Sequence, residues 1–357
     1  MNNTALNELI ETKGSKNKTQ LRAFLITLFN SNYTNFENVI DSDELTSDEY
    51  MPTIIKLQNK IKPDITFSSQ SLSSAEWLHE TITEMGLCYS FNSQLALYNS
   101  PQNIFRYWIN ATRNLLPERK IFELHPLDGE TFVNIVNIPL DHHVFIHGPY
   151  EVADIRSKSL FIGRFSYVQL FLKPLSIITS ENAKQLMVTQ RKCRFYYENN
   201  LEHFPVYTYV LCRMECRIRL TMKLCGCIPH FYKRLPGEKT CNGKGLRCLA
   251  QFKEQLISLE GLESDCKCPV NCEEVNYVAE DVDEHEFLWE SNLQYGIRHF
   301  PEMRLRRDVI FGFSDLLVYI GGVMGLFLGS SVLTVIELLY YFTLRLFWIV
   351  VRNKKMS

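Results

Sequence analysis

PVYTYVLCRMECRIRLTMKLCGC (residues 205–227) and CKCPVNC (residues 266–272) are the two stretches that decide the fold of this chain. The longer stretch predicts a helix over 205–224, with a proline near its start, where proline is favoured. The shorter stretch is expected to be extended. The spacing of the cysteines in both shows how such a helix and strand could be joined.

Cys212 and Cys216 lie on one face of the predicted helix, about 6 Å apart along its axis. Cys266 and Cys268 point to the same side of an extended strand, about 6.6 Å apart. The two spacings match, so an antiparallel strand could be joined to the helix by two disulfides. The same nesting predicts five bonds: Cys193–Cys272, Cys212–Cys268, Cys216–Cys266, Cys225–Cys248 and Cys227–Cys241.

Zinc ligation is the alternative for these cysteines. Cys225-Gly226-Cys227 and Cys266-Lys267-Cys268 could supply four thiolates. Structural zinc sites more often place two residues between paired ligands, and that spacing does not occur in this sequence. We therefore expect disulfides and no metal, which indicates an oxidising compartment.

Composition excludes several classes of protein. The chain has 357 residues and a formal net charge of −2, whereas a nucleic-acid-binding protein usually carries a basic surplus. Hydrophobic residues make up 46%, which is too many for a disordered chain. The sequence has no Gly-X-Ser-X-Gly, phosphate-loop or His-Glu-X-X-His motif, so we expect no enzyme activity and no cofactor.

An uncharged run of 21 residues, Leu316–Ile336, lies close to the C-terminus. As a helix it would rise about 32 Å, which is enough to cross the hydrocarbon core of a membrane. A buried core helix is the alternative, and the further apolar residues after Glu337 argue against it. Basic residues flank the run on both sides and favour a cytoplasmic C-terminus only weakly: Arg304, Arg306 and Arg307 precede it, and Arg345, Arg352, Lys354 and Lys355 follow it.

The cysteines favour residues 1–308 on the outer side of the membrane, since disulfides form in an oxidising compartment, and we expect this membrane to be the plasma membrane. Four glycosylation sequons agree with this topology and begin at Asn2, Asn17, Asn32 and Asn110. The stretch Met1–Glu11 is polar and offers no signal sequence that would carry the chain across a membrane. We therefore expect an upstream segment beyond this sequence. It would also supply a partner for Cys88, the one cysteine outside the five predicted disulfides, which we call the disulfide ladder.

The apolar run carries two patterns. Small residues recur every four positions on one helix face, at Gly321, Gly325 and Gly329, as in closely packed membrane helices. Ser330, Thr334, Glu337 and Tyr341 form a polar stripe. Small residues above hydroxyls and a carboxylate suit a cation pore built by several chains. Simple helix packing, and a Glu337 at the membrane interface, are the alternatives.

Short β runs, with prolines and glycines between them, precede the cysteine-rich segment. The expected strands are Gly86–Asn92, Thr131–Ile138, Val144–His147, Ser166–Leu172 and Leu175–Thr179. Beyond the first predicted helix, a second is expected over Leu246–Glu260, ended by Gly261. The chain therefore mixes helices and strands around a disulfide framework.

Residues 309–331 resemble the second transmembrane helix of degenerin/epithelial sodium channel subunits, and residues 332–345 are most similar to the insect pickpocket branch. All ten cysteines from Cys193 to Cys272 match the spacing of that family's thumb domain. Gly86–Asn92 resembles the family motif Gly-X-Cys-Tyr-X-Phe-Asn, and Thr189–Phe195 also fits. The resemblance covers residues from about 80 to the C-terminus well, and 1–80 loosely.

This resemblance implies an α+β fold and a trimeric, amiloride-sensitive-type sodium channel, assembled from this chain alone or with other subunits. The implied regions are finger and part of the β-ball (1–130), palm and β-ball strands (131–192), thumb (193–272), palm strand and wrist (273–308), pore-lining helix (309–344) and cytoplasmic tail (345–357). The implied selectivity filter is Gly329, Ser330 and Ser331, with Gly325, Thr334 and Glu337 lining the pore and Val318 affecting gating. Family subunits also have a first transmembrane helix, which is not present in this sequence.

Two other functions remain open from the sequence. A non-conducting regulatory subunit could co-assemble with full-length relatives, and a tail-anchored zinc protein would leave the cysteines reduced. His142, His143 and His147 could sense protons, although loop or strand-surface histidines are commoner. The acidic run 280–286 could concentrate cations, although such runs are usually solvated.

Overall fold

The computed structural model describes residues 1–14, 17–68, 70–106, 121–261, 266–301, 303–329 and 331–354. It divides into two units: residues 1–178 with 187–306, and residues 179–186 with 307–357. The first unit holds the sheets and the disulfides, and the second holds the apolar helices.

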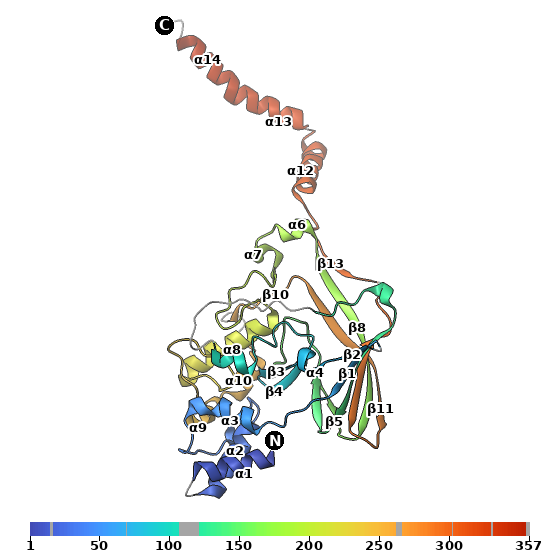
Figure 1. Ribbon diagram of the computed structural model, residues 1–357. Coiled ribbons are helices and arrows are strands. Elements are labelled where there is room, and N and C mark those ends of the chain that lie inside the picture. The colour runs from blue at the N-terminus through green and yellow to red at the C-terminus, as the bar shows by residue number, and fades with distance from the viewer. Residues whose placement is uncertain are drawn as a thin grey trace. The chain divides into compact units, whose positions relative to one another are not determined.

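A seven-stranded sheet forms one side of the first unit, and Figure 1 shows several of its strands side by side. Its strands are β1 (Asp64–Phe67), β2 (Gln70–Leu72), β5 (Thr131–Ile138), β8 (Ser166–Thr179), β11 (Glu274–Glu286), β12 (Ser291–Ile297) and β13 (Leu305–Arg307). The order is β11-β8-β12-β5-β1-β2, and β13 pairs with β8. β12 runs parallel to β8 and antiparallel to β5. The sheet is therefore mixed, with β11 at one edge.

β5 has the bounds predicted from its alternating pattern, and it buries every second side chain over most of its length. β8 is one strand of 14 residues where the sequence predicted two. Pro174 lies within it, opposite Tyr277 of β11, so the pairing of β8 with β11 continues past the proline. β12 and β5 approach so closely at Gly296 that an added Cβ would lie 2.0 Å from the carbonyl oxygen of Thr131.

Three smaller strand pairs lie elsewhere in the described residues. β3 (Leu78–Thr83) pairs with β4 (Gly86–Phe91), and β6 (His142–Phe145) pairs with β7 (Ser159–Ile162). β9 (Cys193–Arg194) runs parallel to β10 (Val270–Asn271). β4 agrees closely with its prediction, whereas the strand expected over Val144–His147 begins two residues earlier.

The helices among the described residues of the first unit are mostly short. They are α1 (Asn3–Lys13), α2 (Lys18–Phe29), α3 (Tyr50–Leu57), α4 (Ser74–Trp77), α5 (Pro101–Arg106), α7 (Val188–Arg191), α8 (Tyr209–Cys225), α9 (Gly243–Ala250) and α10 (Lys253–Ser258). Single turns of 3-10 helix occur at Phe36–Asn38, Ser47–Glu49 and Pro126–Asp128. The largest hydrophobic cluster joins the apolar faces of α1, α2 and α3 to those of α8, α9 and α10. The N-terminal helices and the disulfide-bonded helices therefore share one core.

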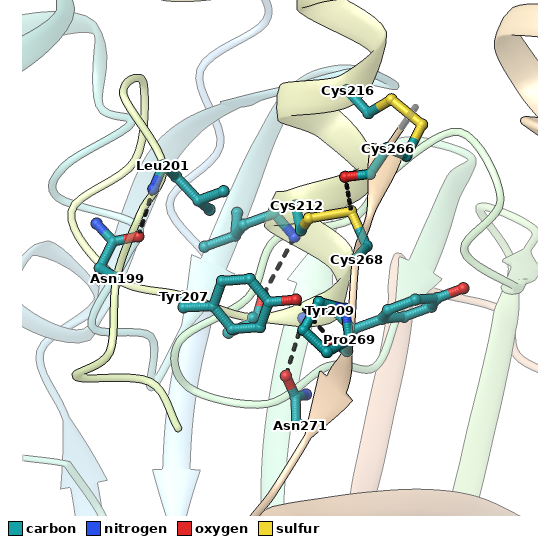
Figure 2. The surroundings of a disulfide bond; sticks show 12 residues. Asn199, Leu201, Tyr207, Tyr209, Cys212, Cys216, Cys266, Cys268, Pro269 and Asn271 are labelled. Carbon is teal, nitrogen blue, oxygen red and sulfur yellow. Dashed lines mark hydrogen bonds between the residues drawn. A yellow bond between two sulfur atoms is a disulfide. The ribbon is translucent and has the colours of Figure 1, made fainter. Parts of the chain in front are cut away.

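α8 carries the disulfide ladder (Figure 2). It starts four residues later than predicted, because the Thr208 hydroxyl accepts a hydrogen bond from the Leu211 backbone N–H and caps it there. Gly226 ends it in a left-handed conformation. The second predicted helix is divided into α9 and α10 at Gln251–Phe252.

The structure contains the five disulfides that the nested spacing predicts: Cys193–Cys272, Cys212–Cys268, Cys216–Cys266, Cys225–Cys248 and Cys227–Cys241. Cys88 has no disulfide partner and its thiol contacts the Thr83 hydroxyl at 3.4 Å. The ladder closes loops of up to 79 residues in sequence separation, and in the chain-entropy account such cross-links stabilise by restricting the unfolded chain.

Candidate functional site

The C-terminal apolar segment is divided into two helices rather than the single helix expected over 309–344. α12 (Phe313–Leu328) and α13 (Val332–Leu339) are separated at Gly329, which has a left-handed φ of 59°. A π-helical turn (Tyr340–Leu344) and α14 (Arg345–Lys354) continue from α13. Glycine adopts this φ at little cost, so residue 329 ends α12 where a β-branched residue would be strained.

Ser331 begins the second helix. Its Oγ accepts a hydrogen bond from the Thr334 backbone N–H at 3.3 Å, and its own backbone N–H donates to Thr334 Oγ1 at 3.4 Å. This reciprocal cap satisfies donors that the break would otherwise leave unpaired. Ser330, the middle residue of the predicted filter, lies outside the described residues. Gly329, Ser331 and Thr334 therefore meet at a break in the helix.

Glu337 lies one turn after Thr334 on α13, and both side chains are exposed in the single chain. Tyr341 follows in the π-helical turn, where Arg345 stacks over its ring at 4.6 Å. Val318 and Gly325, predicted for gating and pore lining, both lie on α12.

One helix among the described residues is long and apolar enough to cross a membrane, Leu333–Val350, with a mean hydropathy of 1.6. Phe313–Phe327 is a shorter apolar helix that precedes it. The predicted run Leu316–Ile336 thus straddles the two. Side chains on every face of these helices are exposed, including Leu326 at 81% and Trp348 at 69%. Such helices need lipid or other protein chains around them.

A short polar contact lies just before α12 within the second unit. The backbone N–H of Ser180 donates to the Arg307 carbonyl at 2.9 Å, and its hydroxyl donates to Asp308 Oδ1 at 2.7 Å. Ser180 also caps α6 (Glu181–Lys184) through the Ala183 backbone N–H. The end of β8 is therefore attached to the residues that lead into the apolar segment.

The predicted sequons lie at different kinds of position. Asn2 and Asn17 cap α1 and α2, and Asn17 is exposed. Asn32 Oδ1 accepts a hydrogen bond from the Thr34 hydroxyl at 2.6 Å. Asn110 lies outside the described residues. The first three all belong to the disulfide-bearing unit.

The candidate proton-sensing histidines are near one another, on and after β6. Burial lowers the pKa of His142 and of His147, and each ring contacts a backbone carbonyl through Nδ1, that of Leu140 and that of Gly148. His143 is exposed, with Nδ1 3.2 Å from Ser159 Oγ. The acidic run 280–286 belongs to β11, the exposed edge strand.

Sequence reasoning missed two buried polar networks. In the first, Arg217 of α8 is fully buried and donates to Glu84 at 2.9 Å and to Asp154 at 2.6 Å. Tyr232 donates a further short hydrogen bond to Glu84. Burial alone would lower the pKa of Arg217, but Glu84, Tyr232 and Asp154 together outweigh burial and raise it. Because these partners are far apart in sequence, no local pattern indicates them.

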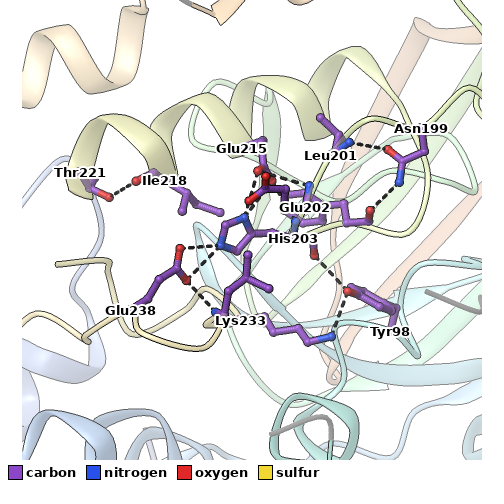
Figure 3. A network of polar contacts seen from close by, with 12 residues as sticks. Tyr98, Asn199, Leu201, Glu202, His203, Glu215, Ile218, Thr221, Lys233 and Glu238 are labelled. Atoms are coloured by element: carbon purple, nitrogen blue, oxygen red, sulfur yellow. Dashed lines mark hydrogen bonds and ion pairs between the residues drawn. The ribbon is translucent and has the colours of Figure 1, made fainter. Parts of the chain in front are cut away.

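The second network surrounds His203 (Figure 3). Its Nδ1 lies 3.0 Å from both carboxylate oxygens of Glu215, and its Nε2 lies 3.1 Å from both oxygens of Glu238. The Tyr98 hydroxyl donates to the His203 carbonyl at 3.0 Å, and Lys233 donates to that hydroxyl at 3.0 Å. This network joins α8 to the segment closed by Cys227–Cys241.

Comparison of the sequence with known proteins identifies a family. The family profile described as "Amiloride-sensitive sodium channel" matches residues 1–341. The Sodium channel protein Nach of Drosophila melanogaster is 24% identical over 316 residues, covering 78% of this chain and 56% of the relative. Pickpocket protein 11 of the same fly is 27% identical over 57% of this chain and 42% of its own length. The human Bile acid-sensitive ion channel is 23% identical, over 82% of this chain and 59% of its own.

The chain spans about half the length of the curated relatives it matches. The match nevertheless extends from the first helices through the disulfide ladder to the break at Gly329 and on to Tyr341. An ion-channel family also agrees with the expectation that the chain is not an enzyme. The chain belongs to the amiloride-sensitive sodium channel family, and within it to the insect pickpocket-like subunits.

Proposed function

We propose that this chain is a subunit of a trimeric sodium channel in the plasma membrane, with residues 1–308 outside the cell and α12 and α13 lining the pore. The observation that carries this proposal is the break between two exposed apolar helices, where Gly329 exposes backbone and Ser331 and Thr334 place hydroxyls. Backbone carbonyls and hydroxyls can replace the hydration shell of a cation. Glu337, one turn further, adds negative charge.

Three copies, or this chain with related subunits, would surround such a pore. A single exposed helix cannot enclose an ion path, and its apolar faces need neighbours. Native mass measurement of the purified complex tests the trimer, because a monomer or a dimer would contradict it. Block of the current by amiloride tests the pharmacology that the family name suggests.

Ser331→Cys tests the pore. In cells that express the chain alone or with a related subunit, a cationic thiol reagent should block current through the variant, because the residue lies beside the ion path. Ser159→Cys, an exposed position in the disulfide-bearing unit, is the control and should leave the current unchanged. Unaltered current and selectivity in Ser331→Cys would contradict the pore assignment.

A second measurement separates a conducting subunit from a regulatory one. Current from the chain alone would remove the regulatory alternative. No current from the chain alone, together with reduced current from a co-expressed relative and no effect of Ser331→Cys, would replace our proposal with that alternative.

At Val318, we expect a bulky substitution to slow channel closing, and normal closing kinetics would contradict a gating role there.

A further inference from the structure

The ring of His203 is held between two carboxylates that come from different elements. His203 is only 3% exposed, and both ring nitrogens lie within hydrogen-bonding distance of carboxylate oxygens. A carboxylate accepts hydrogen bonds and an ionised one cannot donate them, whereas a neutral imidazole carries a single N–H. Only the doubly protonated imidazolium can therefore donate to Glu215 and Glu238 at the same time.

The two carboxylates belong to parts of the thumb that this ring connects. Glu215 is on the second turn of α8, and its oxygens also accept from the backbone N–H of His203 at 3.2 Å. Glu238 lies in the segment between Cys227 and Cys241, and it accepts from the Leu235 backbone N–H at 2.7 Å. The imidazolium therefore links the 228–240 segment to α8 (Figure 3).

Other charged groups face this link from the same segment and from the N-terminal helices. Burial lowers the pKa of Lys233 to about 8, and its amine donates to the Tyr98 hydroxyl at 3.0 Å. Arg234 pairs with Asp48 at 2.6 Å. Once the proton of His203 is lost, one of the two glutamates faces the lone pair of the ring and loses its donor.

We propose that His203 is a proton-held latch, which keeps the 228–240 segment on α8 while the ring is charged and releases it under alkaline conditions. The segment would then stay attached through the Cys227–Cys241 disulfide and the Arg234–Asp48 pair, so the release is local. This inference concerns the thumb alone and does not depend on conduction.

The direction of the effect follows from the ring's surroundings. Burial alone would lower the pKa of His203, but hydrogen bonds from the ring to Glu215 and Glu238 outweigh it and raise the pKa to about 9. When the segment is released, the ring loses Glu238 and keeps Glu215, so its pKa falls from about 9 toward its ordinary value of about 6.5. The latch is therefore fully effective below about pH 6.5, weakens as pH rises, and is lost above about pH 9.

The test uses the full chain in detergent micelles, with histidines labelled at Cε1 for NMR titration. The resonance that disappears in His203→Gln should titrate with a midpoint near pH 9 in the unmodified chain. Glu238→Gln should lower that midpoint by about one unit or more, because one carboxylate no longer favours the charged ring. His143→Gln, at an exposed ring, is the matched control and should leave the midpoint unchanged.

Limited trypsin cleavage after Lys239, which is exposed, measures release of the segment. Cleavage should rise about tenfold per pH unit between pH 7 and 9 relative to a site outside the thumb, and then level off. In His203→Gln it should be fast and independent of pH. A midpoint below pH 7.5, a midpoint insensitive to Glu238→Gln, or cleavage that does not rise with pH would each overturn the proposal.

Discussion

Replacing Arg217 with methionine tests the idea that a buried ion network holds α8 on the rest of the first unit. The methionine side chain keeps much of the volume of arginine but removes its charge and its donors. Arg217 is fully buried and donates to two carboxylates, Glu84 of the β3–β4 turn and Asp154. Without it, Glu84 keeps the Tyr232 hydroxyl and the Ile155 backbone N–H as donors but loses its cation.

The magnitude follows from which charges remain. Asp154 retains Arg213, whose Nη2 lies 2.8 Å from its Oδ2, so only Glu84 becomes an uncompensated buried charge. Removing one member of a buried pair costs about 3–5 kcal/mol, out of the roughly 5–15 kcal/mol by which proteins are usually stable. At roughly 2–4 °C per kcal/mol, the melting temperature should fall by about 10 °C.

Thermal and urea unfolding of the purified full chain would measure this change. Arg219→Met is the matched control, since Arg219 is exposed on the same helix, and we expect a change within about 0.5 kcal/mol. Adding Glu84→Gln to Arg217→Met should restore part of the stability, because it removes the unpaired charge. A loss below about 1 kcal/mol in Arg217→Met, or strictly additive effects in the double variant, would refute the reasoning.

Three further predictions concern acid stability, packing and the approach to the membrane segment. Burial lowers the pKa of His230 to about 4, so the folded chain keeps this ring neutral and should lose up to about 3 kcal/mol as pH falls from 6.5 to 4. His230→Phe should flatten that dependence in thermal unfolding, and an unchanged slope would contradict it. Gly296→Ala should prevent folding, judged by secretion and protease resistance, whereas Gly148→Ala, with its nearest neighbour at 3.7 Å, should be tolerated. Equal yields of both would count against the close strand contact. Ser180→Ala should remove the hydroxyl contact with Asp308 and speed hydrogen exchange at the residues before α12; protection equal to that of the unmodified chain would show that the contact is not stabilising.

Periodicity and cysteine spacing were sufficient to predict the local framework. Matching the rise of a helix to that of a strand paired Cys212 with Cys268, and the alternation of β5 gave its bounds. The errors are at element ends and interruptions. Thr208 caps α8 later than proline alone suggests, and Gly329 interrupts a run whose hydropathy is continuous. A helix cap acts through hydrogen bonds, and a left-handed glycine acts through its backbone angles. A hydropathy profile reports neither of these.

The buried networks could not be predicted, because their partners come together only in the folded chain. Arg217 and Glu84 are 133 positions apart, and Arg217 sits in a stretch of alternating basic and apolar residues that would suit an exposed helix equally well. His203 carries no motif. One sequence alone does not indicate which distant polar residues contact one another. The cysteines are an exception, because they are few and their spacing restricts how they can pair.

The outermost disulfide has a mechanical consequence. Cys193 and Cys272 stand beside each other where β9 and β10 pair, and 79 residue steps separate them along the chain. Those steps correspond to about 270 Å of extended polypeptide. A pull along the backbone from β8 toward the C-terminal helices would pass directly across this one covalent link. The segment between Cys193 and Cys272 would bear no tension and contribute no extension until the bond is reduced, so load carried between β8 and β11 would not deform it.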